Sequence, residues 1–265
     1  MEEEFSVAIG VAVNNEDILE KNVLASPVLK KGQADVRMVR DAKSASIAYN
    51  EIIDTTTEDI IVFVHQDVYL PENWLLNLRN LIAELEENDP NWAILGSYGI
   101  SRIMNEHCGY VWSSSLGRVL GEERTIPEAA QSLDELLIVL KRSSNLRFDE
   151  NLPNFHMYGT DIVQMANENK FGAYIVHLPV VHNDSFHEIL GNDYADSFKY
   201  MRRKWRRKLP IRTTCARLTW RPFTVEFNSL TMWLTHSKRK ELAQPITRSP
   251  KEIAFECGWD STNLD

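Results

Sequence analysis

Short apolar runs alternate with segments of helical periodicity through the first two thirds of the chain. In the periodic segments, apolar residues recur every three or four positions, whereas the runs have strand length and are rich in β-branched residues. Strands are predicted at 7–13, 36–39, 59–64, 92–95, 136–140 and 173–177, and helices at 16–25, 44–53, 74–85 and 160–170. This alternation predicts an α/β fold with a mostly parallel sheet and helices on both faces.

The pattern weakens in two places. Residues 97–130 are rich in glycine, serine and charge, and a long irregular stretch of this kind is usually functional or mobile. From about residue 196 the alternation of strand and helix is lost. We therefore predict an α/β domain over residues 1–195 and a helical or irregular C-terminal extension over 196–265.

Composition fits an ordinary globular protein, because 43% of the 265 residues are hydrophobic and 25% are charged. The three cysteines form no C-x-x-C pair, which favours a reducing compartment. No apolar run approaches the roughly 20 residues that span a bilayer, and the N-terminus is acidic, unlike a secretory signal. The expected location is the cytoplasm, either free or peripheral at the inner face of the membrane.

Charge is concentrated in one segment. The net charge is −9, yet residues 202–208 are all basic except Trp205. Such a segment suits an anionic membrane or a phosphorylated acceptor, although a solvated helix face is an equally simple interpretation. Because the basic stretch is local and the overall charge is negative, a nucleic-acid partner is not expected.

The most informative segment is the strand at 59–64, which runs directly into His65, Gln66 and Asp67. Ligands bind at the carboxyl ends of strands in open α/β sheets, so Asp67 is a candidate metal and phosphate ligand. Asp161 and His182 are two further polar groups at element ends that could meet at the same edge. Each has a structural alternative: a turn residue for Asp67, a helix-terminus charge for Asp161, and a packing histidine for His182.

Several motifs in order resemble those of family-2-type GT-A glycosyltransferases. They are Ala48-Tyr49-Asn50, the segment IIVFVHQDVYLPENWLLNL at 60–78, Phe148-Asp149-Glu150, and HMYGTDIVQMANENKFGAYIVHLPVVH at 156–182. The resemblance covers about residues 5–185 and is closest to a branch whose metal motif reads H-Q-D. It implies a GT-A-like fold for residues 1–195.

The resemblance also implies roles for particular residues. Asp67 matches the last aspartate of the D-x-D motif, His182 matches a histidine that completes the metal site, and Asp161 matches the general base of inverting members. Residues that would bind the nucleotide sugar are Asn14, Asn15, Asp41, Asn50, His65, Gln66 and Asp67. The acceptor-side candidates are Tyr110, Trp112, Asp149 and His156.

These roles suggest a glycosyltransferase that moves a sugar from a nucleotide-diphosphate donor to a carbohydrate or lipid-linked acceptor, with inversion and with Mn²⁺ or Mg²⁺. Because His65 replaces the first acidic residue of D-x-D, the identity of the ion stays open. One alternative is a nucleotidyltransferase, but VAVNNEDIL at 11–19 lacks the glycine-rich loop that holds a triphosphate. The other is a binding module that recognises sugars or nucleotides without turnover.

Overall fold

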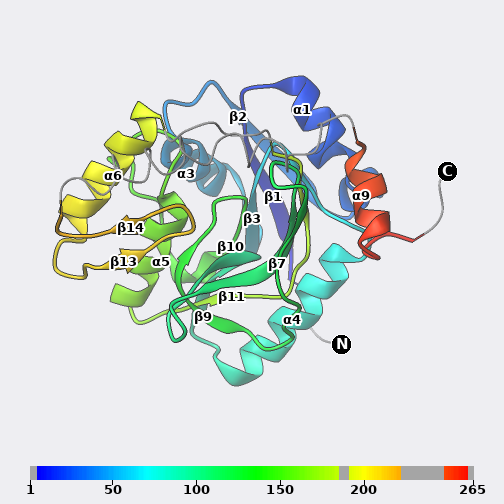
Figure 1. The fold of residues 1–265 in the computed structure, drawn as a ribbon. Helices are drawn as coiled ribbons and strands as arrows, with labels where there is room; N and C mark the ends of the chain where they lie inside the picture. The colour runs from blue at the N-terminus through cyan, green and yellow to red at the C-terminus, as the bar shows by residue number, and fades with distance from the viewer. Residues whose placement is uncertain (1–4, 185–190, 222–247, 262–265) are drawn as a thin grey trace.

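A curled sheet forms the centre of the molecule (Figure 1). The computed structural model describes residues 5–184, 191–221 and 248–261, and in this part of the chain the sheet has 12 strands. The strand order is β2-β1-β3-β10-β5-β11-β9-β6-β7-β12-β4, with β8 paired to β7.

The first half of the sheet follows the predicted strands. β1 (Val7–Val13) lies parallel between β2 (Asp35–Arg40) and β3 (Ile60–His65), and β5 (Trp92–Gly96) is parallel to β11 (Gly172–Ile175). β10 (Leu137–Lys141) runs antiparallel between β3 and β5. The N-terminal end of β10 therefore lies at the same edge as the carboxyl ends of the parallel strands.

The stretch 97–130, predicted to be irregular, instead forms antiparallel strands. They are β6 (Tyr98–Ser101), β7 (His107–Ser113), β8 (Arg118–Gly121) and β9 (Glu128–Leu133). The sheet is thus mixed rather than mostly parallel. The glycines that suggested a loop serve close strand contacts: at Gly109, where φ is +126°, a Cβ would collide with the Ser97 carbonyl oxygen.

Helices cover both faces of the sheet, as predicted (Figure 1). One apolar cluster joins the sheet to α3 (Ala45–Thr55), α5 (Tyr158–Glu168) and α6 (Asn192–Lys204). A second cluster, on the other face, includes residues of α1 (Glu16–Lys21), α2 (Pro27–Lys30) and α4 (Trp74–Asn88).

The helix predicted at 16–25 is interrupted. It begins as expected at Asn15, whose side chain accepts a hydrogen bond from the Ile18 N–H at 3.2 Å. It ends at Asn22, whose amide donates back to the Ile18 carbonyl at 2.8 Å, and a 3-10 turn, η1 (Val23–Ala25), follows. Local amide hydrogen bonds of this kind compete with helical ones. Another 3-10 turn, η2 (Arg142–Ser144), follows β10.

The C-terminal extension contributes to the main core. The boundary predicted at 195/196 falls inside α6, whose buried Tyr194, Phe198 and Met201 share an apolar cluster with α5 and the sheet. After α6 come the hairpin β13 (Ile211–Arg212) and β14 (Arg217–Leu218), and later α9 (Pro250–Glu256). Residues 222–247 of the predicted extension lie outside the described residues. Among the residues described, no helix combines the length and apolar character needed to cross a membrane.

Candidate active site

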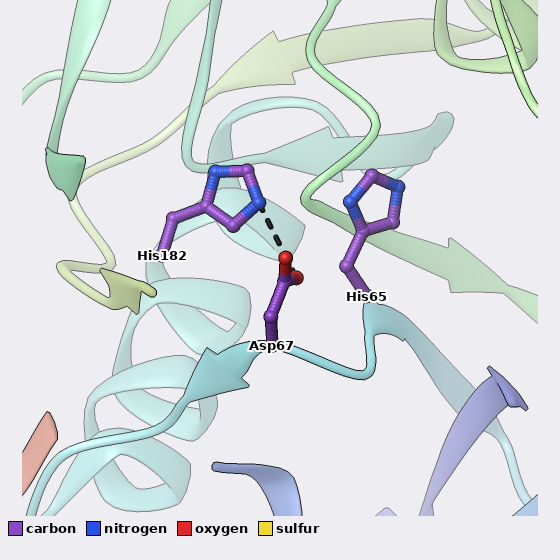
Figure 2. Close-up of side chains that lie close together, drawn as sticks. All are labelled: His65, Asp67 and His182. Atoms are coloured by element: carbon purple, nitrogen blue, oxygen red, sulfur yellow. Dashed lines mark ion pairs between the residues drawn. The ribbon is translucent and has the colours of Figure 1, made fainter. Parts of the chain in front are cut away.

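His65, Asp67 and His182 converge at one edge of the sheet (Figure 2). His65 ends the buried strand β3, Asp67 lies in the turn before β4 (Val68–Tyr69), and His182 ends β12 (Val181–His182). Each residue offers a ligand atom, and these atoms lie within 4.8 Å of one another. The sequence prediction that Asp67 and His182 meet is confirmed, and His65 joins them.

The electrostatics of this cluster fit a divalent cation. Asp67 Oδ1 is buried and, among the residues that the structure describes, has no hydrogen bond of good geometry, although His182 Nε2 lies 3.3 Å away. Burial opposes both charges, but the attraction between the two side chains outweighs it. The pKa of Asp67 is held well below its usual range, and Asp67 with Asp184 raises the pKa of His182 to about 10. A bound cation could replace the His182 proton as the partner of Asp67.

His65 is oriented by Tyr158, a residue that the sequence analysis missed. The Tyr158 hydroxyl donates to the Glu135 carbonyl at 3.1 Å and lies 2.8 Å from His65 Nε2. His65 Nε2 therefore carries the hydrogen in this arrangement, which leaves the Nδ1 lone pair for a cation. Burial lowers the pKa of His65, which favours the neutral form that binds metals.

Asp134 and Glu135 add a second acidic group beside the cluster. Both lie within electrostatic range of Tyr158, and Asp134 is also within range of His65 and His182. Burial and Asp134 raise the pKa of Glu135 to about 8, against backbone hydrogen bonds at the start of α5. An acidic pair directly before the strand at 136–140 was the available signal, but a parallel strand would have placed it at the opposite edge.

The turn after β3 is fastened to the loop after β1. Gln66 Oε1 accepts hydrogen bonds from the backbone N–H groups of Asn14 and Asn15, each at 3.0 Å. These three nucleotide-binding candidates therefore lie together at the edge where Asp67 lies. Asp41 follows β2, the strand next to β1, with a positive φ of 54°.

Asn50 is buried within a protein contact. Its side-chain amide exchanges hydrogen bonds with the backbone of Phe148, at 2.9 and 3.0 Å, and donates to Glu150 at 2.9 Å. These bonds join α3 to the loop that precedes α5. They satisfy the amide without a ligand.

Asp161 faces α6 rather than the group of His65, Asp67 and His182, which we call the metal-type cluster. It is 1% exposed, and its two carboxylate oxygens accept hydrogen bonds from Lys204 Nζ at 2.8 Å and Trp205 Nε1 at 2.7 Å. Lys204 also bonds Asp149 at 2.7 Å. Burial raises the pKa of Asp161, and Lys204 opposes that rise. In this arrangement Asp161 holds the end of α6 against α5, and Asp149 holds it against the loop that precedes α5.

The aromatic acceptor candidates lie on the other side of the sheet. Trp112 is paired with Val181, which faces the opposite side of the sheet from its neighbour His182. Trp112 therefore points away from His182, and so does Tyr110, which lies two residues earlier on the same strand. Tyr110 packs against Trp259 at 5.6 Å. His156 pairs with Asp193 at 3.1 Å, within electrostatic reach of His65. The structure thus separates Tyr110 and Trp112 from the cluster.

Part of the basic segment 202–208 packs against the rest of the protein. Trp205 is buried under Lys204 and Lys208, whose ammonium groups lie 5.2 and 4.9 Å from its ring. Lys208 also pairs with Glu168 at 3.2 Å. Arg203, Arg206 and Arg207 are exposed. These three arginines therefore form the exposed part of the segment, while Trp205 belongs to the hydrophobic core.

Comparison with known proteins identifies the family of this chain. Residues 8–196 match the family model described as "Glycosyltransferase like family". A curated relative, "ATP synthase subunits region ORF 6" of Fuscovulum blasticum, is 26% identical over 161 residues, which cover 57% of this chain. The match spans 61% of the length of that relative.

Three solved structures are similar to this chain at low sequence identity. GalNAc-T7 with UDP, GalNAc and Mn²⁺ is 11% identical, with a TM-score of 0.49 over 97% of this chain and 58% of its own. The mannosyltransferase PcManGT from Pyrobaculum calidifontis, with GDP-Man and Mn²⁺, is 12% identical, with a TM-score of 0.45 over 97% and 80%. TarS 1-349 of S. aureus is 12% identical, with a TM-score of 0.47 over 87% and 71%.

The chain belongs to this glycosyltransferase-like family, because the family model covers well over half of it. The α/β class predicted from the sequence is confirmed by the structure, and the predicted membership of a glycosyltransferase family is confirmed by the family model.

Proposed function

We propose that this protein is a glycosyltransferase that binds a nucleoside-diphosphate sugar together with Mn²⁺ or Mg²⁺ and transfers the sugar with inversion. The observation that carries the proposal is the cluster of His65, Asp67 and His182, in which a buried carboxylate oxygen of Asp67 faces His182 at 3.3 Å and has no hydrogen bond of good geometry from any described residue. Two imidazoles and one carboxylate leave room for substrate oxygens around a hard or borderline cation.

Asp67, His182 and His65 would hold the cation, which would stabilise the negative charge that develops on the leaving diphosphate. Tyr158 would orient His65. Gln66 fixes the loop after β1 against the turn that carries Asp67, and Asp41 lies at the same edge beside it. We propose that this edge binds the nucleotide and that Asp41 contacts its base or ribose.

The acceptor hydroxyl must lose a proton, and two carboxylates are candidates for this step. Family resemblance favours Asp161, which would first have to exchange its hydrogen bonds with Lys204 and Trp205 for one with the acceptor. Position in the fold favours Glu135, which precedes β10 at the edge where His65 lies and whose backbone carbonyl accepts a hydrogen bond from Tyr158. The raised pKa of Glu135 suits a general base near neutral pH.

The acceptor would be a carbohydrate or a lipid-linked sugar. The exposed Arg203, Arg206 and Arg207 support contact with a phosphate-bearing acceptor or an anionic membrane surface. Assembly of a cell-surface polysaccharide is the process that fits such an acceptor.

Calorimetric titration of UDP and GDP, each with and without Mn²⁺, tests donor binding. The expected result is binding of one nucleotide that depends on Mn²⁺ and is lost in Asp67→Ala. Asp196→Ala, on the exposed surface of α6, is the matched control. A ligand at about 100 times its Kd should also raise the free energy of unfolding by about 2.7 kcal/mol. Equal affinity in wild type and Asp67→Ala would exclude this site.

Turnover separates the enzyme from the two alternatives. A glycosyltransferase should release nucleoside diphosphate from its sugar donor only when Mn²⁺ or Mg²⁺ is present. A binding module would bind the donor without release. A nucleotidyltransferase would instead consume a nucleoside triphosphate and a sugar phosphate and release pyrophosphate.

A further inference from the structure

A very short ladder of two strands contains His182 and directly follows Asp67, two of the three residues in the metal-type cluster. In it, β12 pairs antiparallel with β4, with Val181 opposite Tyr69 and His182 opposite Val68. One further hydrogen bond, from the Asn183 N–H to the Asp67 carbonyl at 2.8 Å, extends the pairing to Asp67. On its other edge β12 is paired with the longer strand β7, but β4 is the last strand of the sheet order and, among the described residues, has only this two-residue pairing. Because so short a pairing has little stability of its own, other contacts must hold β4 in place.

The C-terminal segment 249–261 covers the other side of this ladder. Tyr69 and Val181 form a separate apolar cluster with Ile253 and Ala254 of α9, and all four side chains are buried. Because neighbouring strand residues face opposite ways, Val181 packs on α9 while His182 points toward Asp67 (Figure 2). Figure 1 shows α9, in red, close to the start of α4.

Asp260 fastens the segment with polar contacts. It is 7% exposed; Oδ2 accepts a hydrogen bond from the Tyr69 hydroxyl and Oδ1 accepts one from the Glu72 N–H, both at 2.6 Å. Glu72 Oε2 in turn accepts a hydrogen bond from the Ser261 N–H at 3.1 Å. Short hydrogen bonds to a buried carboxylate are strong and specify geometry. Asp260 therefore fixes the residue that lies two positions after Asp67.

We propose that residues 249–261 are a brace that positions Asp67 and His182 for a divalent cation, and that Asp260 is its positioning residue. This inference rests on the metal site of the proposed function. The brace acts from the face of the ladder opposite His182, so it can tune the site without touching the cation.

The expected effect is a loss of metal affinity without a loss of the fold. Residues that orient metal ligands change affinity by about 10- to 100-fold when they are removed. Asp260 acts through Tyr69 rather than directly on a ligand, so we expect Asp260→Ala to raise the Kd for Mn²⁺ by about tenfold, at the lower limit of that range. Tyr69→Phe removes only the hydroxyl and should have a smaller effect in the same direction.

The experiment is a titration of the full chain with Mn²⁺ alone, followed by the electron paramagnetic resonance signal of the free ion. Asp196→Ala matches the substitution at an exposed site. Phe198→Leu destabilises the core near α6 and is the control for stability. Urea unfolding of each variant shows whether a change in affinity merely follows stability.

The brace is supported if Asp260→Ala and Tyr69→Phe weaken Mn²⁺ binding while Phe198→Leu, destabilised to a similar extent, binds normally. It is overturned if wild type binds Mn²⁺ and both variants bind equally well. It is also overturned if Phe198→Leu weakens binding as much as they do. If wild type itself fails to bind Mn²⁺, the proposed metal site fails with it. Should Asp260→Ala not fold, Tyr69→Phe decides between the first two outcomes.

Discussion

Lys204 is the residue whose removal should most clearly reveal the role of Asp161. Its ammonium group bonds both Asp161, at 2.8 Å, and Asp149, at 2.7 Å. Replacing Lys204 by methionine keeps the length and apolar stem of the side chain but removes the charge. Asp161 would then keep its bond from Trp205 and lose the one cationic partner that it has among the described residues.

The expected loss of stability in Lys204→Met follows from the burial of Asp161. Removing one partner of a buried ion pair costs about 3–5 kcal/mol, because the other charge is left buried without compensation. Asp161 is 1% exposed, but the Lys204 side chain is 23% exposed and the Trp205 bond remains. We therefore expect Lys204→Met to lower the free energy of unfolding by about 2–4 kcal/mol at pH 7.

Urea unfolding with a matched control measures this loss. Lys208→Met breaks an ion pair whose side chains are 33% and 54% exposed, and it should cost less than about 1 kcal/mol. Adding Asp161→Asn to Lys204→Met should recover part of the stability, because the buried charge disappears. If Lys204→Met and Lys208→Met lose equal stability, Asp161 does not depend on Lys204 and the burial argument is wrong.

The pH dependence of the same variant gives a second check. Burial raises the pKa of Asp161, and removing Lys204 should raise it further. When the folded pKa of an acid exceeds its unfolded value, the folded state takes up the proton first, so lowering the pH stabilises it. The stability difference between wild type and Lys204→Met should therefore shrink between pH 7 and pH 5. A constant difference would mean that Asp161 stays charged in the variant.

Three other predictions use different residues. The pKa of Glu135 in the folded protein is about 8, above its unfolded value of 4.5. The free energy of unfolding of wild type, measured by urea unfolding, should therefore fall as the pH rises from 4.5 to about 8, and Glu135→Gln should reduce this pH dependence. Once a donor and acceptor are known, Glu135→Gln or Asp161→Asn, whichever removes the true base, should lower transfer by roughly 10²-fold or more while donor affinity stays normal; near-normal transfer by both would exclude both. Changing Arg203, Arg206 and Arg207 to glutamine should reduce sedimentation with anionic liposomes at low salt, and equal pelleting would exclude membrane docking through this surface.

Local sequence signals predicted the parts of the fold that depend on neighbours in the chain. The run from Ile60 to Asp67 shows both the strand and the point where it reaches a site, because burial and polarity change there within three residues. The Asn15 cap and the apolar stripe of α4 were readable for the same reason. His182 was harder, since only its resemblance to a metal histidine distinguished it from a packing residue.

The direction of strand β10 could not be predicted from the sequence, and it decides which residues lie beside the metal-type cluster. β10 has the same apolar composition whether it runs parallel or antiparallel, and only its pairing with β3 and β5 brings Asp134 and Glu135 to the metal-type edge. The partners of Asp161 and Tyr69 were equally hidden, because Lys204 and Asp260 lie 43 and 191 residues away in the chain. A carboxylate at a helix start and one near a chain end look alike in sequence. Burial and partners separate them: Asp161 holds two helices together, while Asp260 supports the ladder that ends at His182.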